Sequence, residues 1–113
     1  MLSIGREFAM SGGSLVAADR IIIGNHVTIG ANSVLIDTDF HPIEPSARNT
    51  APQAGETAPV IIEDHVFIGM NCLVLKGVKI GQGSMVGAGS VVSSDIPAGV
   101  VAAGNPARVI RAL

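Results

Sequence analysis

Aromatic side chains are almost absent from this sequence of 113 residues, which contains three Phe and neither Trp nor Tyr. Such large side chains commonly dominate the core of a compact domain. Glycine, in contrast, occurs 14 times. This combination argues against an aromatic-filled core. It favours a narrow core lined by small aliphatic side chains, with tight turns between short strands.

Charged residues are also scarce, at 14% of the chain, whereas hydrophobic residues reach 48%. A small free-standing domain needs a well-charged surface, so we expect part of this one to be buried against another subunit. The net charge of −2 provides no electrostatic footprint for nucleic acid. No basic stretch suggests attachment to an anionic membrane. The sequence therefore predicts a self-associating protein without a nucleic-acid or membrane partner.

Signals for disulfide formation, secretion and membrane insertion are lacking. The single Cys72 excludes an internal disulfide framework and fits a reducing cytosol. Residues 1–6 have neither the basic region nor the long apolar region of a signal peptide. Apolar runs such as 21–23 are far too short to cross a bilayer. We therefore expect a cytoplasmic protein that folds as one domain over residues 1–113.

A repeat of six residues dominates the chain. Aliphatic residues recur at this spacing, and the residue four positions after each of them is small or β-branched, as at Val66 and Ser84. A helix would repeat every three or four residues, whereas a period of six is compatible with strands. We interpret each hexad as one face of a triangular coil, with coils stacked by parallel pairing and the aliphatic side chains pointing inward. These residues are Ile23, Ile29 and Leu35, then Ile62, Ile68, Val74, Ile80, Val86 and Val92.

The register is weaker near the N-terminus. Ile4, Met10 and Val16 share a register, but Ile23 follows seven positions after Val16. One residue is therefore expected to be inserted between the first and second coils.

Two segments are predicted to leave the repeat. The gap from Leu35 to Ile62 is not a multiple of six, and the Pro-rich segment 42–59 cannot continue a ladder of strands. We predict an external loop there, either a lid or a disordered insertion. The segment 95–99 looks like a terminating turn, and residues 95–113 are predicted to cap the open coil end.

Three further segments stand out: Asp37-Thr38-Asp39-Phe40-His41-Pro42, Leu75-Lys76-Gly77-Val78-Lys79-Ile80-Gly81 and Gly104-Asn105-Pro106-Ala107-Arg108. Together with the hexads they resemble the hexapeptide-repeat acyltransferases, and within them the maltose/galactoside O-acetyltransferases and the sugar acetyltransferases of polysaccharide biosynthesis. The resemblance implies an all-β, left-handed parallel β-helix and a homotrimer; the handedness comes from the resemblance alone, as an exception to the right-handed crossover rule. Members are usually longer at the N-terminus, so we expect a truncated relative or a C-terminal piece.

The resemblance implies direct transfer of an acetyl group from acetyl-CoA to a hydroxyl of a sugar or polysaccharide precursor, with no metal required. It places the family's catalytic histidine at His41, and an imidazole suits a general base because its pKa is near neutrality. The alternative is a histidine satisfied by the backbone at the loop entry. Asp37 and Asp39 flank it, and either could fix its tautomer. Asp39 is therefore a second catalytic candidate, unless it is a turn residue.

The cofactor is expected to run along the prism in the groove between neighbouring subunits, which places the active site at a subunit interface. Two arginines near the prism end would bind its phosphates, unless they belong to a solvated tail. Ser94 departs from the family, which commonly has Lys there. The cofactor contacts implied by the resemblance are Met70, Ala88, Ser93, Ser94, Arg108 and Arg111.

Other functions remain open. A zinc-dependent carbonic anhydrase on the same fold needs three convergent histidines, but His26 and His65 occupy outward corner positions. Cys72 occupies a small-residue position of the repeat, so we interpret it as a thiol of the core. A non-catalytic trimeric scaffold that binds only coenzyme A is the other alternative. No residue distinguishes a free sugar from a nucleotide-linked or lipid-linked one, or a hydroxyl from an amine.

Overall fold

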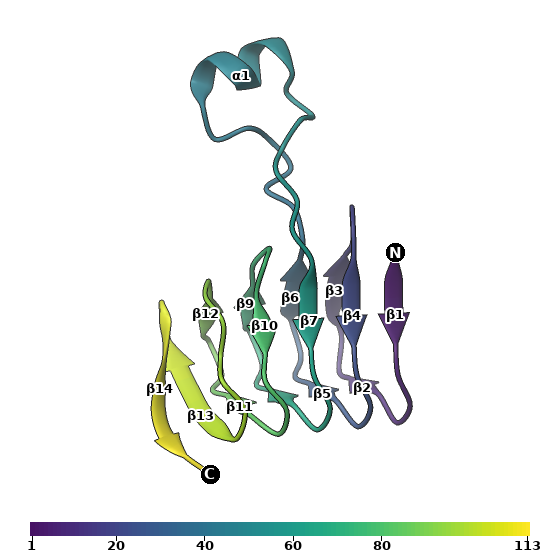
Figure 1. Cartoon of the computed structure of the whole chain (residues 1–113), viewed down its shortest axis with the longest axis vertical. Coiled ribbons are helices and arrows are strands. Elements are labelled where there is room, and N and C mark those ends of the chain that lie inside the picture. Colours follow the sequence, from purple (N-terminus) through teal and green to yellow (C-terminus); the bar gives the residue numbers. More distant parts are fainter.

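The chain folds into a parallel β-helix of three sheets, and the computed structural model describes all 113 residues. Up to β12, each coil contributes one short strand to each sheet (Figure 1). The first sheet comprises β1 (Leu2–Ile4), β4 (Ile21–Ile23), β7 (Val60–Ile62) and β10 (Lys79–Ile80). The second comprises β2 (Ala9–Met10), β5 (Thr28–Ile29), β8 (Phe67–Ile68), β11 (Met85–Val86), β13 (Val100–Gly104) and β14 (Ala107–Ala112). The third comprises β3 (Gly13–Val16), β6 (Ser33–Ile36), β9 (Leu73–Val74) and β12 (Val91–Val92).

Aliphatic side chains fill the interior that the three sheets enclose, and they stack from coil to coil. Ile23 lies opposite Ile62, and Ile62 opposite Ile80, because parallel pairing keeps equivalent positions of successive hexads in register. From Ile23 to Val92 the aliphatic residues of the repeat are at most 2% exposed, and burying each contributes about 1.5–3 kcal/mol. The predicted parallel β-helix is confirmed. Its left-handed winding stays a prediction from the family resemblance.

Serine residues at the corners connect successive coils. The Ser33 hydroxyl donates to the Gly69 carbonyl at 2.9 Å and accepts from the Cys72 N–H at 3.2 Å. Ser84 likewise makes both bonds to the next coil, whereas Ser90 donates to Gly87 of its own coil and accepts from Gly104 of the next. The sequence predicted only that a small residue lets the backbone turn. The structure adds that a hydroxyl at this position satisfies main-chain groups of the corner.

The first coil differs from the predicted register at its third strand. Leu15 lies opposite Leu35 and packs against the core, whereas Val16 lies opposite Ile36. The inward position assigned to Val16 is therefore wrong. The step from Met10 to Leu15 is one residue short of a hexad, and the corner between β3 and β4 takes up the difference.

The segment between β6 and β7 leaves the β-helix and projects far from one of its edges (Figure 1). This excursion (residues 37–59) begins earlier than predicted and contains the unpredicted short helix α1 (Pro45–Thr50). Thr38 and Thr57 form an antiparallel bridge that joins its two limbs at the base. No helix of the chain has the length and apolar character that crossing a membrane requires.

The predicted terminating turn at 95–99 instead continues the β-helix. Ile96 is 4% exposed and pairs with Ile80, so the first sheet gains one more bridge. The last coil is short, because Ala102 lies opposite Val86, 16 positions earlier, whereas Val86 lies opposite Ile68, 18 positions earlier. β14 then runs antiparallel to β13 and forms the edge of the second sheet.

Asp37 anchors the point where the chain leaves the third sheet. Its fully buried carboxylate accepts hydrogen bonds from the backbone N–H groups of Ala18, Asp19 and Arg20, at 2.8, 2.7 and 2.6 Å. These donors form the corner between β3 and β4, so the bonds tie the base of the excursion to the preceding coil. Burial by itself would raise the pKa of Asp37, but the backbone hydrogen bonds outweigh burial and hold the pKa below its ordinary value.

Replacing Asp37 by Asn should destabilise the fold. In the wild type three N–H donors share a charged carboxylate, whereas the amide of the variant offers them one uncharged acceptor. Hydrogen bonds to a charged group contribute about 1.5–3 kcal/mol, so a urea titration at pH 7 should show a loss of that size. A carboxylate with a lowered folded-state pKa stabilises the fold above its unfolded-state pKa, and this stability is lost as pH falls through the folded-state pKa. The deficit of the variant should therefore shrink on acidification below about pH 4.

Asp19→Asn is the matched control, since Asp19 is exposed and enters this cluster only through its backbone N–H. Its stability should equal that of the wild type at both pH values. A deficit of Asp37→Asn that did not change with pH would show that the charge has no part in the clamp.

Candidate functional site

Most of the residues predicted to form the site lie on the two edges of the third sheet, and the two arginines lie on β14 of the second sheet. Its strands are parallel, so their first residues share one edge, which we call the leading edge, and their last residues share the other, the trailing edge. Met70 and Ala88 precede β9 and β12 and therefore lie at the leading edge. The excursion that carries His41 follows β6, and Ser93 and Ser94 follow β12, so these groups lie at the trailing edge.

His41 is exposed near the base of the excursion, and its ring is oriented by the opposite limb. The Nδ1 atom lies 2.5 Å from the carbonyl oxygen of Pro52. A carbonyl can only accept a hydrogen bond, so Nδ1 carries the proton and Nε2 of the neutral ring keeps its lone pair. Phe40 has a φ of 62°, which bulky residues rarely adopt, and the His41 N–H closes this turn by donating to the Asp39 carbonyl at 2.7 Å. The arrangement leaves a basic nitrogen free of protein hydrogen bonds.

Neither aspartate of the motif bonds to this ring, contrary to the expectation that one of them fixes its tautomer. Asp37 is occupied by the N–H groups of the preceding coil. The Oδ2 atom of Asp39 lies 3.4 Å from Nζ of Lys76, and it accepts no hydrogen bond although it is shielded from solvent. The Pro52 carbonyl takes the orienting role instead. No sequence signal pointed to it, because any residue can supply a main-chain carbonyl.

Met70 and Ala88 are brought together at the leading edge, in adjacent coils. The Gly89 N–H donates to the Met70 carbonyl at 2.9 Å. A Cβ atom at Gly69 would lie 2.7 Å from the Ala88 nitrogen, so the two backbones meet too closely for a side chain there. Both Met70 and Ala88 are exposed. The small side chain of Ala88 leaves the main chain at this edge accessible to a ligand.

Arg108 and Arg111 project from β14. Arg108 lies opposite Ala103 near the end of β13, which places it beside the leading edge, and Arg111 lies farther along, opposite Val101. Both side chains are exposed, and their guanidinium groups donate only to main-chain carbonyls of adjacent residues, at 3.1 and 3.2 Å. Neither arginine is paired with an acidic side chain, so both charges are available to an anionic ligand.

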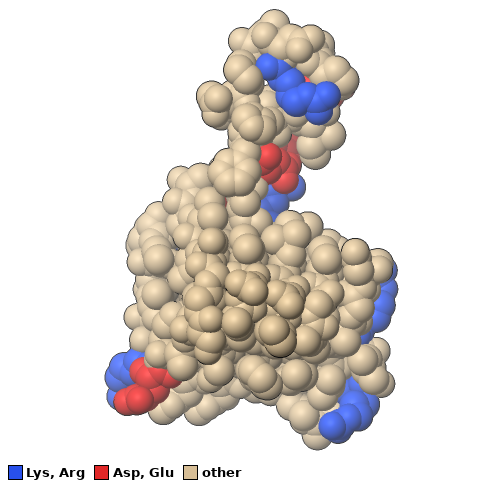
Figure 2. Space-filling view, turned by 180° about the vertical axis from the view of Figure 1, so that it is seen from behind, with Lys and Arg blue, Asp and Glu red and all other residues tan.

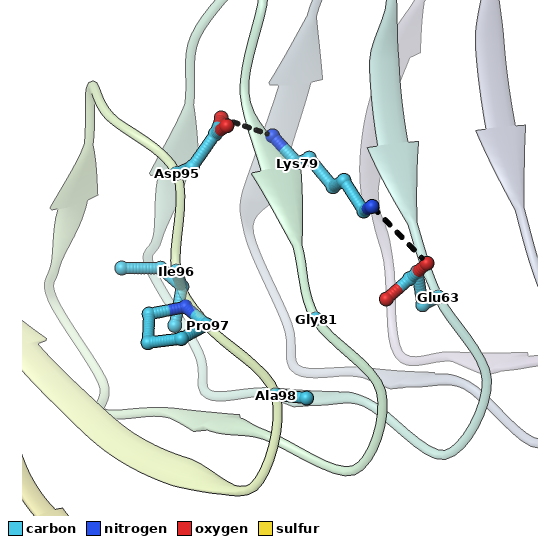
Figure 3. Close-up of a pocket in the computed structure, with 7 residues that line it drawn as sticks. All are labelled: Glu63, Lys79, Gly81, Asp95, Ile96, Pro97 and Ala98. Carbon is cyan, nitrogen blue, oxygen red and sulfur yellow. Dashed lines mark hydrogen bonds and ion pairs between the residues drawn. The ribbon is translucent and has the colours of Figure 1, made fainter.

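A single chain does not gather these groups into one cavity. The largest hollow, of about 410 Å³, lies against the last coil of the first sheet and contains none of the predicted site residues (Figure 3). There Nζ of Lys79 lies 3.5 Å from Glu63, and the Lys79 N–H donates to the Asp95 carboxylate at 2.9 Å. The short step from Val92 to Ile96 is the sequence signal that could have revealed this hollow.

The outer side of the third sheet is apolar. Figure 2, which views the molecule from behind, shows charged side chains only around the margins of this side. An apolar face between two edges that carry predicted site residues is suited to packing against another subunit. Beyond the first coil, whose Ser14 and Val16 share this side, the outward residues include the partly buried Val34, Ile36, Leu73, Leu75 and Val91.

The other histidines and the cysteine lie where the hexads placed them. His26 and His65 are exposed at corners of adjacent coils, and their rings stack with centroids 5.0 Å apart. Cys72 is buried, and burial raises the pKa of its thiol. No three His, Cys, Asp or Glu side chains of the chain come together as metal ligands.

Comparison with known proteins identifies both repeat arrays. A family model for the hexapeptide repeat of succinyl-transferase matches residues 20–39 and 59–94, on either side of the excursion. The galactoside O-acetyltransferase of Lactococcus lactis subsp. lactis is 46% identical over 98 residues, which are 87% of this chain and 46% of that protein. The 2,3,4,5-tetrahydropyridine-2,6-dicarboxylate N-acetyltransferase of Staphylococcus aureus is 46% identical over 88 residues, which are 78% of this chain and 31% of that protein. The chain thus spans less than half the length of these relatives.

Solved structures share the same architecture. A hexapeptide-repeat acetyltransferase from Vibrio cholerae superimposes with a TM-score of 0.92 at 33% identity, over 99% of this chain and 62% of that one. Its complex with acetyl coenzyme A, from strain O1 biovar eltor, has a TM-score of 0.76 at 27% identity, over 98% and 70% of the two chains. The chain belongs to the hexapeptide-repeat acetyltransferase family.

Proposed function

We propose that the chain is an acetyl-CoA-dependent O-acetyltransferase that acts on a hydroxyl of a sugar or polysaccharide precursor, with His41 as general base. The observation that carries the proposal is the oriented imidazole, whose Nδ1 donates to Pro52 and whose Nε2 is free to accept a proton. The acetyltransferase relatives, and the neighbour bound to acetyl coenzyme A, support the donor. The galactoside relative supports a sugar hydroxyl as the acceptor.

The reaction in this proposal needs no acyl-enzyme. The acceptor oxygen attacks the thioester carbonyl while Nε2 of His41 takes the hydroxyl proton. The tetrahedral intermediate then collapses, the carbon–sulfur bond breaks, and the coenzyme A thiolate receives the proton from the imidazolium. The Pro52 carbonyl stabilises the imidazolium through its bond to Nδ1. Asp39 contributes indirectly, because its ion pair with Lys76 anchors the base of the excursion to the next coil.

Coenzyme A would lie along the leading edge in this proposal. The small, exposed side chain of Ala88 would let the pantetheine arm lie against the main chain. The unpaired guanidinium groups of Arg108 and Arg111 would bind phosphate. Ser93 and Ser94 lie at the other edge with His41, so they would contact cofactor held by a neighbouring chain.

A homotrimer would unite the two edges. Each chain carries His41 at the trailing edge and the coenzyme A contacts mainly at the leading edge, with the apolar face of the third sheet between them. If these faces pack around a threefold axis, the leading edge of one subunit meets the trailing edge of the next. Each active site would then be shared by two subunits.

A second candidate function is a scaffold that binds coenzyme A without transferring its acetyl group. Two observations favour it. No cavity of the single chain contains His41, and the chain spans less than half of its curated relatives. Turnover in the presence of acceptor sugars distinguishes the two functions.

His41→Ala should abolish most of the turnover and leave coenzyme A affinity unchanged. A positioned general base contributes about 10²–10⁴ in rate, so kcat measured against a panel of sugars should fall by that factor. Because the imidazole must be neutral to accept a proton, wild-type kcat should decrease as pH is lowered, and this limb should vanish in the variant. A variant that kept more than about a tenth of wild-type kcat would place the base elsewhere.

Arg108→Ala should weaken the donor and spare the chemical step. A charge-assisted hydrogen bond to phosphate contributes about 1.5–3 kcal/mol, so KM for acetyl-CoA should rise about ten- to a hundred-fold. Arg6→Ala is the matched control, because Arg6 is equally exposed but lies in the first coil. Normal KM with reduced kcat in Arg108→Ala would give this residue another role.

The protein should sediment with about three times the 11.5 kDa mass of the chain. Leu73→Glu, on the outer face of the third sheet, should reduce this mass to that of a monomer because it buries a charge at the interface. Ile61→Glu makes the same change in charge on the outer side of the first sheet and should leave the mass unchanged. A monomeric wild type at micromolar concentration would refute the shared site.

A further inference from the structure

The hydroxyl of Ser90 connects the corner that carries Ala88 to the hairpin that carries Arg108. Ser90 is 1% exposed. Its Oγ donates to the Gly87 carbonyl at 2.6 Å and accepts from the Gly104 N–H at 3.0 Å. Gly87 directly precedes Ala88, and Gly104 is the last residue of β13, where the chain turns into β14.

This hydroxyl adds a side-chain bond at a corner where the last coil has no counterpart of the main-chain bond found in earlier coils. At the same corner one coil earlier, the Gly89 N–H donates to the Met70 carbonyl, and before that the Asn71 N–H donates to the Ala31 carbonyl. In the last coil the chain turns back into β14 instead of continuing. Its corner is therefore joined to the preceding coil by the Gly87 N–H, which donates to the Ala102 carbonyl at 2.8 Å, and by the side chain of Ser90.

We propose that Ser90 is a positioning residue for the donor: it fixes the arginines of β14 relative to the main-chain surface at Ala88. The inference rests on the proposed function, because these two groups are the proposed contacts for the phosphates and the pantetheine arm of one coenzyme A molecule. A ligand that spans both groups binds well only when their separation is held constant. Ser90 touches neither ligand nor reacting atoms in this account and acts only through the main chain.

Ser84 provides a matched control within the same chain. Its Oγ donates to the Pro97 carbonyl at 2.6 Å and accepts from the Val100 N–H at 3.0 Å, and it is fully buried. Both of these bonds reach the last coil, at the corner between the first and second sheets, whereas Ser90 has one bond to the last coil and one to Gly87 of its own coil. Loss of either hydroxyl should cost similar stability, whereas only Ser90 connects the two proposed parts of the donor site.

The test compares two donors with Ser90→Ala and Ser84→Ala. Acetyl-CoA needs both parts of the site, whereas S-acetyl-pantetheine lacks the nucleotide phosphates and needs only one. Loss of one neutral hydrogen bond corresponds to about a two- to ten-fold change in an equilibrium. We therefore expect Ser90→Ala to raise KM for acetyl-CoA by about that factor, with unchanged kcat and unchanged kcat/KM for S-acetyl-pantetheine. Ser84→Ala should leave both donors unaffected.

Two conservative variants distinguish loss of the hydroxyl from misfolding of Ser90→Ala. Ser90→Thr keeps the hydroxyl and should restore KM for acetyl-CoA. Ser90→Cys keeps the shape that Cys72 already has at the equivalent position, but a thiol is a weak acceptor, so it should behave like the alanine variant. Equal losses with both donors, or the same KM shift in Ser84→Ala, would reduce Ser90 to a structural residue. Wild-type protein that bound no coenzyme A in calorimetry would instead overturn the proposed function and this inference with it.

Discussion

Parallel pairing between residues one coil apart is the interaction on which the rest of the structure depends. A single coil of short strands cannot bury its aliphatic side chains or satisfy its main-chain groups. Stacking does both, because Ile23, Ile62 and Ile80 cover one another while N–H and carbonyl groups bond along the prism axis. The side chains of the core only need to be small and aliphatic, which explains how the chain folds with three aromatic residues.

The same pairing decides where chemistry can occur. A continuous ladder leaves no interior space, so functional groups must lie on the edges or on segments that leave the ladder. The excursion does so without breaking the stack, since Ile23 and Ile62 remain opposite each other on its two sides. Its base is held by the buried carboxylate of Asp37, and its opposite limb supplies the Pro52 carbonyl that orients His41. Because the proposed site residues lie on both edges of one sheet, the proposed site would be completed by a second subunit.

Much of the fold was predictable because the core position repeats every six residues. The repeat identified the inward aliphatics and the departure of the chain before Ile62. It failed where the spacing changes: Leu15 took the place predicted for Val16, and Ile96 entered the core where a terminating turn was expected. A count of residues cannot tell in which corner an insertion or deletion is absorbed. That choice depends on which side chain fills the prism.

The site was predictable only as far as side chains identify it. Motif residues pointed to His41 and to the arginines, but hydrogen bonds to main-chain groups leave no mark in a sequence. Asp37 and Asp39 illustrate this limit, since adjacency along the chain suggested that one of them orients His41, whereas their carboxylates face Ala18 and Lys76. Likewise, a small residue at position 90 was predictable, but its bond to Gly104 required the three-dimensional arrangement.

Subunit complementation tests whether each active site is shared by two subunits. His41→Ala lacks the proposed base at the trailing edge, and Ala88→Trp blocks the proposed cofactor site at the leading edge, so each variant alone should be inactive. If each site combines the two edges of different chains, trimers refolded from an equimolar mixture of the two variants should contain some intact sites. Such a site forms where the trailing edge of an Ala88→Trp chain, which keeps His41, meets the leading edge of a His41→Ala chain, which is not blocked. Random assembly should then restore about a quarter of wild-type activity. An inactive mixture, with mixed trimers demonstrated by co-purification through a tag on one variant, would contradict the shared site.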